Sequence, residues 1–237
     1  MPKMYRVHKL LSMIGYCSRR SAERLIESGQ VTINSKIVTP GDKWFVGDEL
    51  EINGVKIDLS LLNKQEIEII KYHKRLGEVV SRDDPFNSNT VFNSLPDIEG
   101  RWISIGRLDK NSSGLLLFTN NGELANKMMH PSSAIEREYI VETDQMISKD
   151  NLSLLCEGVP INNGQVGKFN KIINISKNTY SIILSTGKNR EIRNSLKYIK
   201  HKTQSLKRVR YSDIKLDDLQ VGEYRYLSED EKSIFLT

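Results

Sequence analysis

The chain has 237 residues, of which 38% are hydrophobic and 27% are charged. This composition excludes an intrinsically disordered chain, and the length suits a medium-sized domain joined to a smaller one. The sequence contains no apolar run near the roughly 18 residues of a membrane-spanning helix, so we expect no membrane partner. The 35 basic and 30 acidic residues give a net charge of only +5, so the distribution of charge has to indicate whether the partner is a polyanion.

The cysteines and histidines suggest neither a disulfide framework nor a metal site. The two cysteines, Cys17 and Cys156, are too few and too far apart for either. The four histidines never fall at the spacing of about three to five residues that presents two imidazoles to one metal ion. The first residues lack the apolar stretch of a signal peptide, so we expect the protein to stay in a reducing cytoplasm.

Residues 1–55 are predicted to form a small module of two short helices followed by short strands. Val7, Leu10 and Leu11 recur at helical spacing, and Ser18 is a suitable N-cap for a second helix that Gly29 ends. Short apolar runs around turns at residues 34–36 and 47–48 indicate strands. The helices carry a cationic face, although a charge run is equally well explained as an ordinary solvated surface. The basic residues of this face are Arg6, Lys9, Arg19, Arg20 and Arg24.

A second domain is predicted over residues 67–237, after a linker at 56–66 that shows no clear period. Apolar runs predict strands at 67–72, 102–105, 115–119, 139–141 and 180–184, and helical spacing predicts helices at 123–129 and 189–198. These elements do not alternate regularly. We therefore expect an α+β domain with a mixed, mainly antiparallel sheet and not a doubly wound parallel fold.

The connection at residues 106–114 has the composition of a turn and carries a carboxylate, Asp109, in Gly106-Arg107-Leu108-Asp109-Lys110-Asn111-Ser112-Ser113-Gly114. Short polar residues and glycine occur in any turn, because they cap local amides and tolerate positive φ. Asp109 nevertheless follows a predicted buried strand and lies two residues after Arg107, in a connection small enough to approach a ligand. The residues alone fit both an ordinary turn and a catalytic carboxylate.

Basic residues concentrate near the C-terminal end of the chain. Residues 187–211 hold nine basic side chains and one acid, whereas residues 212–237 hold seven acids and three bases. A helix within this stretch could be an ordinary surface helix. Together with the N-terminal module, however, it places cationic regions on both sides of the middle of the chain, which suits a large folded polyanion better than a small metabolite.

The segment Val7–Leu50, with Cys17-Ser18-Arg19-Arg20-Ser21-Ala22-Glu23-Arg24 in its middle, resembles the small RNA-binding domain named after ribosomal protein S-four. In that family the two helices and their loop lie against structured RNA. The resemblance implies that Arg19, Arg20 and Arg24 contact phosphates.

The rest of the chain resembles the RsuA/RluB branch of RNA pseudouridine synthases. The resemblance is carried by Gly106-Arg107-Leu108-Asp109, by residues 113–119, by Arg137-Glu138-Tyr139, by residues 187–193 and by Arg208-Val209-Arg210-Tyr211. It implies isomerisation of one uridine of ribosomal RNA to pseudouridine, with no cofactor. The expected partner is large-subunit (23S) ribosomal RNA or a pre-ribosomal large-subunit particle, with small-subunit RNA as the alternative, and the protein is expected to be a monomer.

The same resemblance implies roles for individual residues. Asp109 is expected to be the essential carboxylate, Arg193 its basic partner, and Tyr139 the tyrosine that lies against the uracil ring. A cation within about 4 to 6 Å would keep an enclosed carboxylate ionised. The remaining expected contacts are to substrate, from Arg107, Ile192, Arg190 and Lys188, and to RNA, from the five basic residues of the N-terminal module together with Arg208 and Arg210. Taken alone, Tyr139 and Ile192 would equally be ordinary packing residues.

The chain departs from the family pattern at two positions. Lys74-Arg75-Leu76-Gly77 lacks the proline that usually follows the lysine, which leaves the rigidity of this loop in question, and Asn194 replaces a second arginine after Arg193. A catalytically silent RNA-binding assembly factor would share the basic faces but has no need to retain Asp109, Tyr139 and Arg193 together. A nucleoside glycosidase would need a second carboxylate as the acid, and none stands out beside Asp109.

Overall fold

The structure is a computed structural model that describes residues 4–59, 66–82, 84–98 and 100–236. The chain divides into two compact units. The N-terminal unit comprises Met1–Ile67 and Asp97–Arg101, and the C-terminal unit comprises Glu68–Pro96 and Trp102–Thr237. Of the linker expected at 56–66, residues 60–65 lie outside the described part of the chain. Among the described residues, no helix is long and apolar enough to cross a bilayer.

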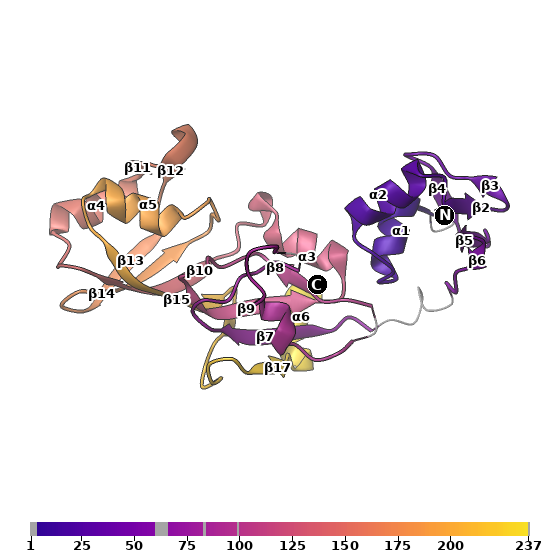
Figure 1. Cartoon of the computed structure of the whole chain (residues 1–237). Helices are drawn as coiled ribbons and strands as arrows, with labels where there is room; N and C mark the ends of the chain where they lie inside the picture. The colour runs from indigo at the N-terminus through magenta and orange to yellow at the C-terminus, as the bar shows by residue number, and fades with distance from the viewer. Residues whose placement is uncertain (1–3, 60–65, 83, 99, 237) are drawn as a thin grey trace. The chain divides into compact units, whose positions relative to one another are not determined.

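The N-terminal unit is built from two helices and short antiparallel strands, coloured indigo in Figure 1. Ser18 caps the second helix as predicted, because its hydroxyl oxygen accepts a hydrogen bond from the amide of Ser21 at 3.1 Å. Leu10, Leu11 and Trp44 are buried in the core of the N-terminal unit. The elements are β1 (Met4–Arg6), α1 (Val7–Met13), α2 (Arg19–Glu27), β2 (Val31–Ile33), β3 (Lys36–Ile37), β4 (Lys43–Phe45), β5 (Leu50–Ile52) and β6 (Val55–Lys56), with strands paired as β1-β4 and β3-β2-β5-β6.

The C-terminal unit contains a nine-stranded sheet in the order β13-β14-β10-β15-β9-β7-β17, with β16 paired to β15 and β8 to β9. Its strands are β7 (Ile69–Lys74), β8 (Ile103–Ile105), β9 (Ser113–Thr119), β10 (Arg137–Thr143), β13 (Lys171–Ser176), β14 (Thr179–Leu184), β15 (Thr203–Tyr211), β16 (Ile214–Lys215) and β17 (Tyr224–Tyr226). The β15–β9 pair is parallel and the other named pairs of the sheet are antiparallel. The predicted α+β class with a mainly antiparallel sheet is confirmed.

The helices pack on two parts of this sheet (Figure 1). Helices α4 (Lys149–Glu157) and α5 (Glu191–Tyr198) lie at the β13–β14 end, where they contact β13 and β15 respectively. Helix α3 (Gly122–Met129) contacts β8, β9 and α6 (Glu229–Leu236). The remaining elements are the 3₁₀ turns at Val91–Ser94, Pro131–Ser133 and Asn162–Gly164 and the strand pair β11 (Val159–Pro160) and β12 (Val166–Gly167).

A glycine lets the two central parallel strands meet. Gly114 of β9 lies opposite Arg208 of β15 and has a φ of +100°. A Cβ on Gly114 would lie 2.2 Å from the carbonyl oxygen of Arg208, so no larger residue fits without a shift of the backbone. This close approach lies at the start of β9, immediately after the loop that carries Asp109.

Candidate active site

Asp109 lies on the loop between β8 and β9 and is partly open to solvent. Leu108 before it is buried at 7% exposure and anchors the loop in the core. The amide of Ser112 donates a hydrogen bond to the carbonyl oxygen of Asp109 at 2.9 Å, which closes a turn. The Asp109 side chain is 34% exposed, so a ligand can reach the carboxylate.

Two arginines at the start of α5 approach the Asp109 carboxylate. Nη1 of Arg190 lies 3.3 Å from Oδ2, and Nε of Arg193 lies 4.0 Å from the same oxygen. The family resemblance implies Arg193 as the partner of Asp109 and Arg190 as a substrate contact. The structure brings all three together and places Arg190 closer to the carboxylate. Arg190 adopts a left-handed conformation with a φ of +51° at the residue preceding the helix.

Arg193 also holds the backbone of the Asp109 loop. Its Nη2 donates to the carbonyl oxygen of Asn111 at 2.6 Å and contacts the Ser112 hydroxyl at 3.4 Å. Burial, helped by the neighbouring Arg190, lowers the pKa of Arg193, and the Asp109 carboxylate opposes this effect. Its buried Nε has no hydrogen-bond partner within the described part of the chain. Arg193 therefore fixes the loop, and its Nε faces the Asp109 carboxylate at 4.0 Å, beyond hydrogen-bond distance.

Lys74, which the sequence marks only as part of a loop motif, supports the Asp109 loop from β7. Its side chain is buried, and Nζ donates to the carbonyl oxygens of Ser112 at 2.8 Å and Arg75 at 2.9 Å. Burial lowers the pKa of Lys74 to about 8, while the carboxylates of Glu78 and Asp109 act in the opposite direction. The sequence feature that could have indicated this role is the position of Lys74, which is the first residue of the motif Lys74-Arg75-Leu76-Gly77 and follows an apolar strand.

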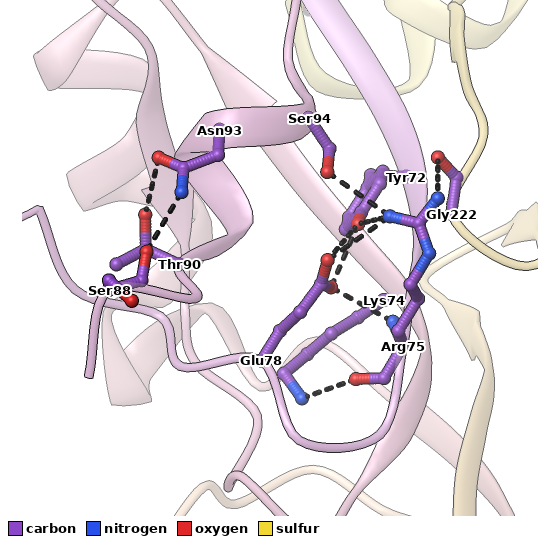
Figure 2. A network of polar contacts seen from close by, with 9 residues as sticks. All are labelled: Tyr72, Lys74, Arg75, Glu78, Ser88, Thr90, Asn93, Ser94 and Gly222. Carbon is purple, nitrogen blue, oxygen red and sulfur yellow. Dashed lines mark hydrogen bonds and ion pairs between the residues drawn. The ribbon is translucent and has the colours of Figure 1, made fainter.

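A polar network takes the place of the missing proline in the loop that follows Lys74 (Figure 2). The hydroxyl of Tyr72 donates to the carboxylate of Glu78 at 2.8 Å, and the backbone amide of Arg75 donates to the same carboxylate at 3.0 Å. The Arg75 guanidinium reaches Glu78 at 3.2 Å, Ser94 at 3.1 Å and the carbonyl oxygen of Gly222 at 3.4 Å. Glu78 is 1% exposed, so its bonds with Tyr72 form inside the protein, whereas the Arg75 side chain is 46% exposed and reaches Ser94 and Gly222 at the surface.

Tyr139 lies in the same row of the sheet as two residues described above. On β10 it pairs with Arg208 of β15, Arg208 pairs with Gly114 of β9, and Gly114 pairs with Lys74 of β7. Tyr139 is half-buried and packs against the hydrophobic cluster that includes Ile192 and Leu196 of α5. The row ends on β7 at the lysine that holds the Asp109 loop.

The structure corrects the role expected for Arg208. This side chain is 2% exposed, and its Nε donates to the carbonyl oxygen of Leu115 at 2.7 Å. Its guanidinium also lies over the ring of Tyr211, 5.3 Å from the centroid. The prediction that Arg208 contacts RNA directly is wrong in this conformation, because the side chain stabilises the centre of the sheet.

The other residues expected to contact substrate or RNA differ in exposure and in the partners that their side chains already have. Arg107 is exposed. Ile192 is 4% exposed and belongs to the core cluster. The Nζ of Lys188 donates to the carbonyl oxygen of Val166. Arg210 donates to the carboxylates of Glu138 on β10 and Glu136 just before it. Only Arg107 and Arg190 of the expected substrate contacts are thus exposed, and the charge of Arg210 is already balanced.

Most of the basic residues predicted to bind RNA in the N-terminal unit are exposed to solvent. Arg6, Arg19, Arg20 and Arg24 are exposed, and Lys9 is half-buried with its ammonium 5.7 Å from the centre of the Tyr5 ring. Within the described residues, no group of three or more histidine, cysteine, aspartate or glutamate side chains could hold a metal ion.

Comparison with known proteins gives matches over both units. Residues 68–198 match the RNA pseudouridylate synthase family, and residues 6–50 match the S4 domain. "Ribosomal large subunit pseudouridine synthase B" of Vibrio vulnificus is 37% identical over 94% of this chain and 74% of that protein. The protein of the same name from Escherichia coli K12 is 37% identical over 94% of this chain and 82% of that protein. A solved pseudouridylate synthase at 23% identity shares the fold, with a TM-score of 0.71 over 98% of this chain and 99% of that chain.

The family match covers more than half of the chain, includes the loop with Asp109 and extends through the helix with Arg193. The matched relatives are aligned over most of their own length. The chain therefore belongs to the RNA pseudouridylate synthase family.

Proposed function

We propose that this protein isomerises a uridine of large-subunit ribosomal RNA to pseudouridine. The relatives named above act, by their names, on the large ribosomal subunit. The observation that carries the proposal is the Asp109 carboxylate, which is one-third exposed and lies 3.3 Å from Arg190 and 4.0 Å from Arg193. Such a group is both available to a nucleotide and flanked by positive charge.

In the proposed reaction, Asp109 breaks or assists in breaking the bond between the ribose and the uracil. The carboxylate adds to the ring or to the anomeric carbon, or helps to generate the anomeric cation, while the bond between N1 and the anomeric carbon breaks. The base turns, its carbon 5 bonds to the anomeric carbon, and any bond to Asp109 breaks again. Loss of the proton from carbon 5 and protonation of N1 complete the isomerisation. The guanidiniums of Arg190 and Arg193 lie beside the carboxylate, at 3.3 and 4.0 Å, and are proposed to hold it in place for the reaction. Tyr139 is proposed to lie against the uracil and to accept the proton that leaves carbon 5.

The uridine has to leave the RNA stack before this chemistry is possible, because a stacked and paired base hides its glycosidic bond. Extrusion costs a few kcal/mol. Contacts from cationic side chains to phosphates offset this cost, and Arg107 is proposed to fill the gap that the nucleotide leaves. The exposed arginines of α2, which lie in the part of the chain that matches the S4 domain, supply further phosphate contacts. We further propose that the protein acts as a monomer in the cytoplasm, on free ribosomal RNA or on a large-subunit precursor.

The test uses large-subunit and small-subunit ribosomal RNA transcribed in vitro, which contain no pseudouridine. Because the product has the same mass as the substrate, it is detected by carbodiimide labelling and primer extension. We expect the wild-type protein to modify one site in the large-subunit RNA, and Asp109→Asn to bind this RNA without modifying it.

The matched control is Asp213→Asn, which removes an exposed carboxylate from the turn between β15 and β16. This variant should modify the RNA at the wild-type rate. Modification by Asp109→Asn at the wild-type rate would refute the role of Asp109. Binding without modification by the wild-type protein, both of free RNA and of large-subunit precursor particles, would favour the silent assembly factor. Modification of small-subunit RNA alone would change the substrate.

A further inference from the structure

Two strongly exposed apolar side chains belong to segments that are hydrogen-bonded to the neighbour of Asp109. Phe86 is 91% exposed and Leu76 is 66% exposed. The amide of Gly77, next to Leu76, donates to the carbonyl oxygen of Lys110 at 2.9 Å. The ammonium of Lys110 donates to the side chain of Asn87, next to Phe86, at 2.7 Å. Both apolar residues thus flank the loop that carries the candidate catalytic carboxylate.

The turn that carries Phe86 is closed by its own hydrogen bonds. The carboxylate of Asp84 accepts from the backbone amide of Phe86 at 3.0 Å and from the side-chain amide of Asn87 at 3.2 Å. The backbone amide of Asn87 also donates to the carbonyl oxygen of Asp84, at 3.3 Å, which closes the turn. The hydrogen bonds of the turn therefore hold Phe86 in an exposed position.

The far end of the same loop is also fixed (Figure 2). The side chain of Asn93 donates to the carbonyl oxygen of Ser88 at 2.9 Å and accepts from the Thr90 hydroxyl at 3.3 Å. Ser94 is held by Arg75, as described above. A loop that is ordered before binding loses little conformational entropy when a ligand arrives, which favours its use as a binding element.

A single exposed apolar residue on a protein surface is ordinary and needs no explanation. Phe86 differs because its turn is fixed, because it is almost fully exposed, and because the exposed cations Lys110 and Arg107 belong to the loop beside it. An aromatic ring bordered by cations is the usual platform on which proteins stack unpaired nucleobases. Extrusion of a uridine toward Asp109 would expose the faces of the bases on either side of it.

We propose that Phe86 stacks on a nucleobase adjacent to the extruded uridine and so contributes to substrate recognition. The inference rests on the proposed function, because it requires a flipped nucleotide at Asp109. Phe86 covers the face of a neighbouring base that the extruded uridine no longer covers, while Arg107 occupies the gap itself. Since every base has an aromatic face, the contact contributes affinity and positions the RNA without fixing the sequence.

The experiment measures the Kd for large-subunit RNA transcribed in vitro and the kcat and KM for pseudouridine formation. Phe86→Ala should weaken binding by about tenfold or more, as expected for the loss of one base–aromatic stack. KM should rise by a similar factor, while kcat at saturating RNA should stay within about twofold. Phe86→Trp should retain wild-type affinity. Thermal unfolding should not change, because a side chain that is 91% exposed contributes little to the core.

The control is Met146→Ala, which removes another exposed apolar side chain, 64% exposed, from the turn before α4. It should leave Kd and KM unchanged. A direct readout uses an RNA fragment with 2-aminopurine beside the uridine that carbodiimide mapping identifies. Wild-type protein and Phe86→Trp should quench its fluorescence more than Phe86→Ala does.

An unchanged Kd for Phe86→Ala would overturn the proposal, and would be the result if a protein partner covered this residue instead. Equal weakening by Phe86→Ala and Phe86→Trp would overturn it as well, because a stacking site accepts the larger ring. If the wild-type protein binds RNA without modifying it, the proposed function fails, while the comparison of Kd values still decides the role of Phe86.

Discussion

Two arginines approach the same carboxylate oxygen, and their surroundings differ. Arg193 is mostly buried, and its guanidinium spans the Asn111 carbonyl oxygen and the Asp109 carboxylate. Arg190 is 46% exposed and makes one contact to Asp109 at 3.3 Å. A planar guanidinium can serve two acceptors at fixed angles, whereas an ammonium is a compact point charge. An exposed pair, in contrast, contributes little and tolerates replacement.

We therefore predict that Arg193→Lys lowers kcat for pseudouridine formation by about a hundredfold, as the loss of a fixed donor at a reacting charge does in other enzymes. Arg190→Lys should lower kcat by less than about tenfold, because a lysine at this exposed position keeps the charge. The measurement is kcat and KM with saturating large-subunit RNA, together with the thermal unfolding midpoint of each variant. A greater loss in Arg190→Lys than in Arg193→Lys would reverse these assignments.

At the same scale, the sequence indicated which residues to examine but not which of them are buried. The resemblance selected Asp109 and Arg193, and the structure brings them within 4.0 Å. It also selected Arg208, whose side chain is buried against the carbonyl oxygen of Leu115. Within a run of basic residues, the sequence does not distinguish a buried side chain from an exposed one. The neighbouring strand, which is distant in the sequence, decides which of them finds an acceptor inside the protein.

At the level of the elements, the end of β7 and its loop act as a support for the active-site loop. The Lys74 ammonium and the Gly77 amide donate to two carbonyl oxygens of the Asp109 loop, at 2.8 and 2.9 Å. Glu78 and Arg75 hold the supporting loop itself. A buried lysine that binds two carbonyl oxygens carries a charge whose removal from water is costly.

This cost predicts a pH dependence of stability. Burial lowers the pKa of Lys74 to about 8 from its ordinary 10.5, so between these values the unfolded chain binds more protons than the folded one. The free energy of unfolding therefore rises with pH over this range, and the desolvation cost is fully present below pH 8. The neutral amine keeps two N–H groups, enough for the Arg75 and Ser112 carbonyl oxygens.

In Lys74→Met this contribution is absent. The difference in free energy of unfolding between the wild-type protein and the variant should increase by about 2 to 3 kcal/mol from pH 7 to pH 10. Urea denaturation at each pH measures it, with Lys177→Met, at an exposed turn, as a control that should show no trend. Burial raises the pKa of Tyr72 to about 12, so above pH 10 the free energy of unfolding of both proteins should fall with pH, and this contribution cancels in the difference. A constant difference from pH 7 to pH 10 would show that Lys74 titrates normally.

The elements themselves were predictable where the apolar pattern was clear. The buried strand β9, and the helices α3 and α5, lie where apolar runs and helical spacing placed them. The strands β13 and β15 were missed. β13, Lys-Ile-Ile-Asn-Ile-Ser, holds three isoleucines without strict alternation, and five of its six residues are exposed in the structure. β15 is rich in basic residues and has no apolar run. Both strands form through pairing with neighbouring strands. The helix α4 has only Leu155 buried, which is too weak a period to recognise.

Across the whole molecule, cationic side chains are available for RNA in both units. In the N-terminal unit, three exposed arginines, Arg19, Arg20 and Arg24, lie on α2. In the C-terminal unit, the exposed cations close to the candidate site in the chain or in space are Arg107, Lys110 and Arg190. The net charge of +5 conceals this arrangement, because residues 212–237 hold seven acids and only three bases. If both units bind the same RNA, removing charge from α2 should affect affinity and leave the chemistry intact.

We predict that replacing Arg19, Arg20 and Arg24 together by alanine lowers the affinity for large-subunit RNA and its dependence on salt. Each phosphate contact contributes about 0.7 to 0.9 to the slope of log K against log salt concentration, so three lost contacts reduce its magnitude by about 2 to 3. The rate of modification at saturating RNA should stay near that of the wild-type protein, because Asp109 and its arginines are unchanged. The control replaces Lys149, Lys171 and Lys177, three exposed lysines on α4, on β13 and in the turn after β13, and removes the same charge. Equal slopes for both triple variants would show that α2 contributes only general charge and makes no phosphate contacts of its own.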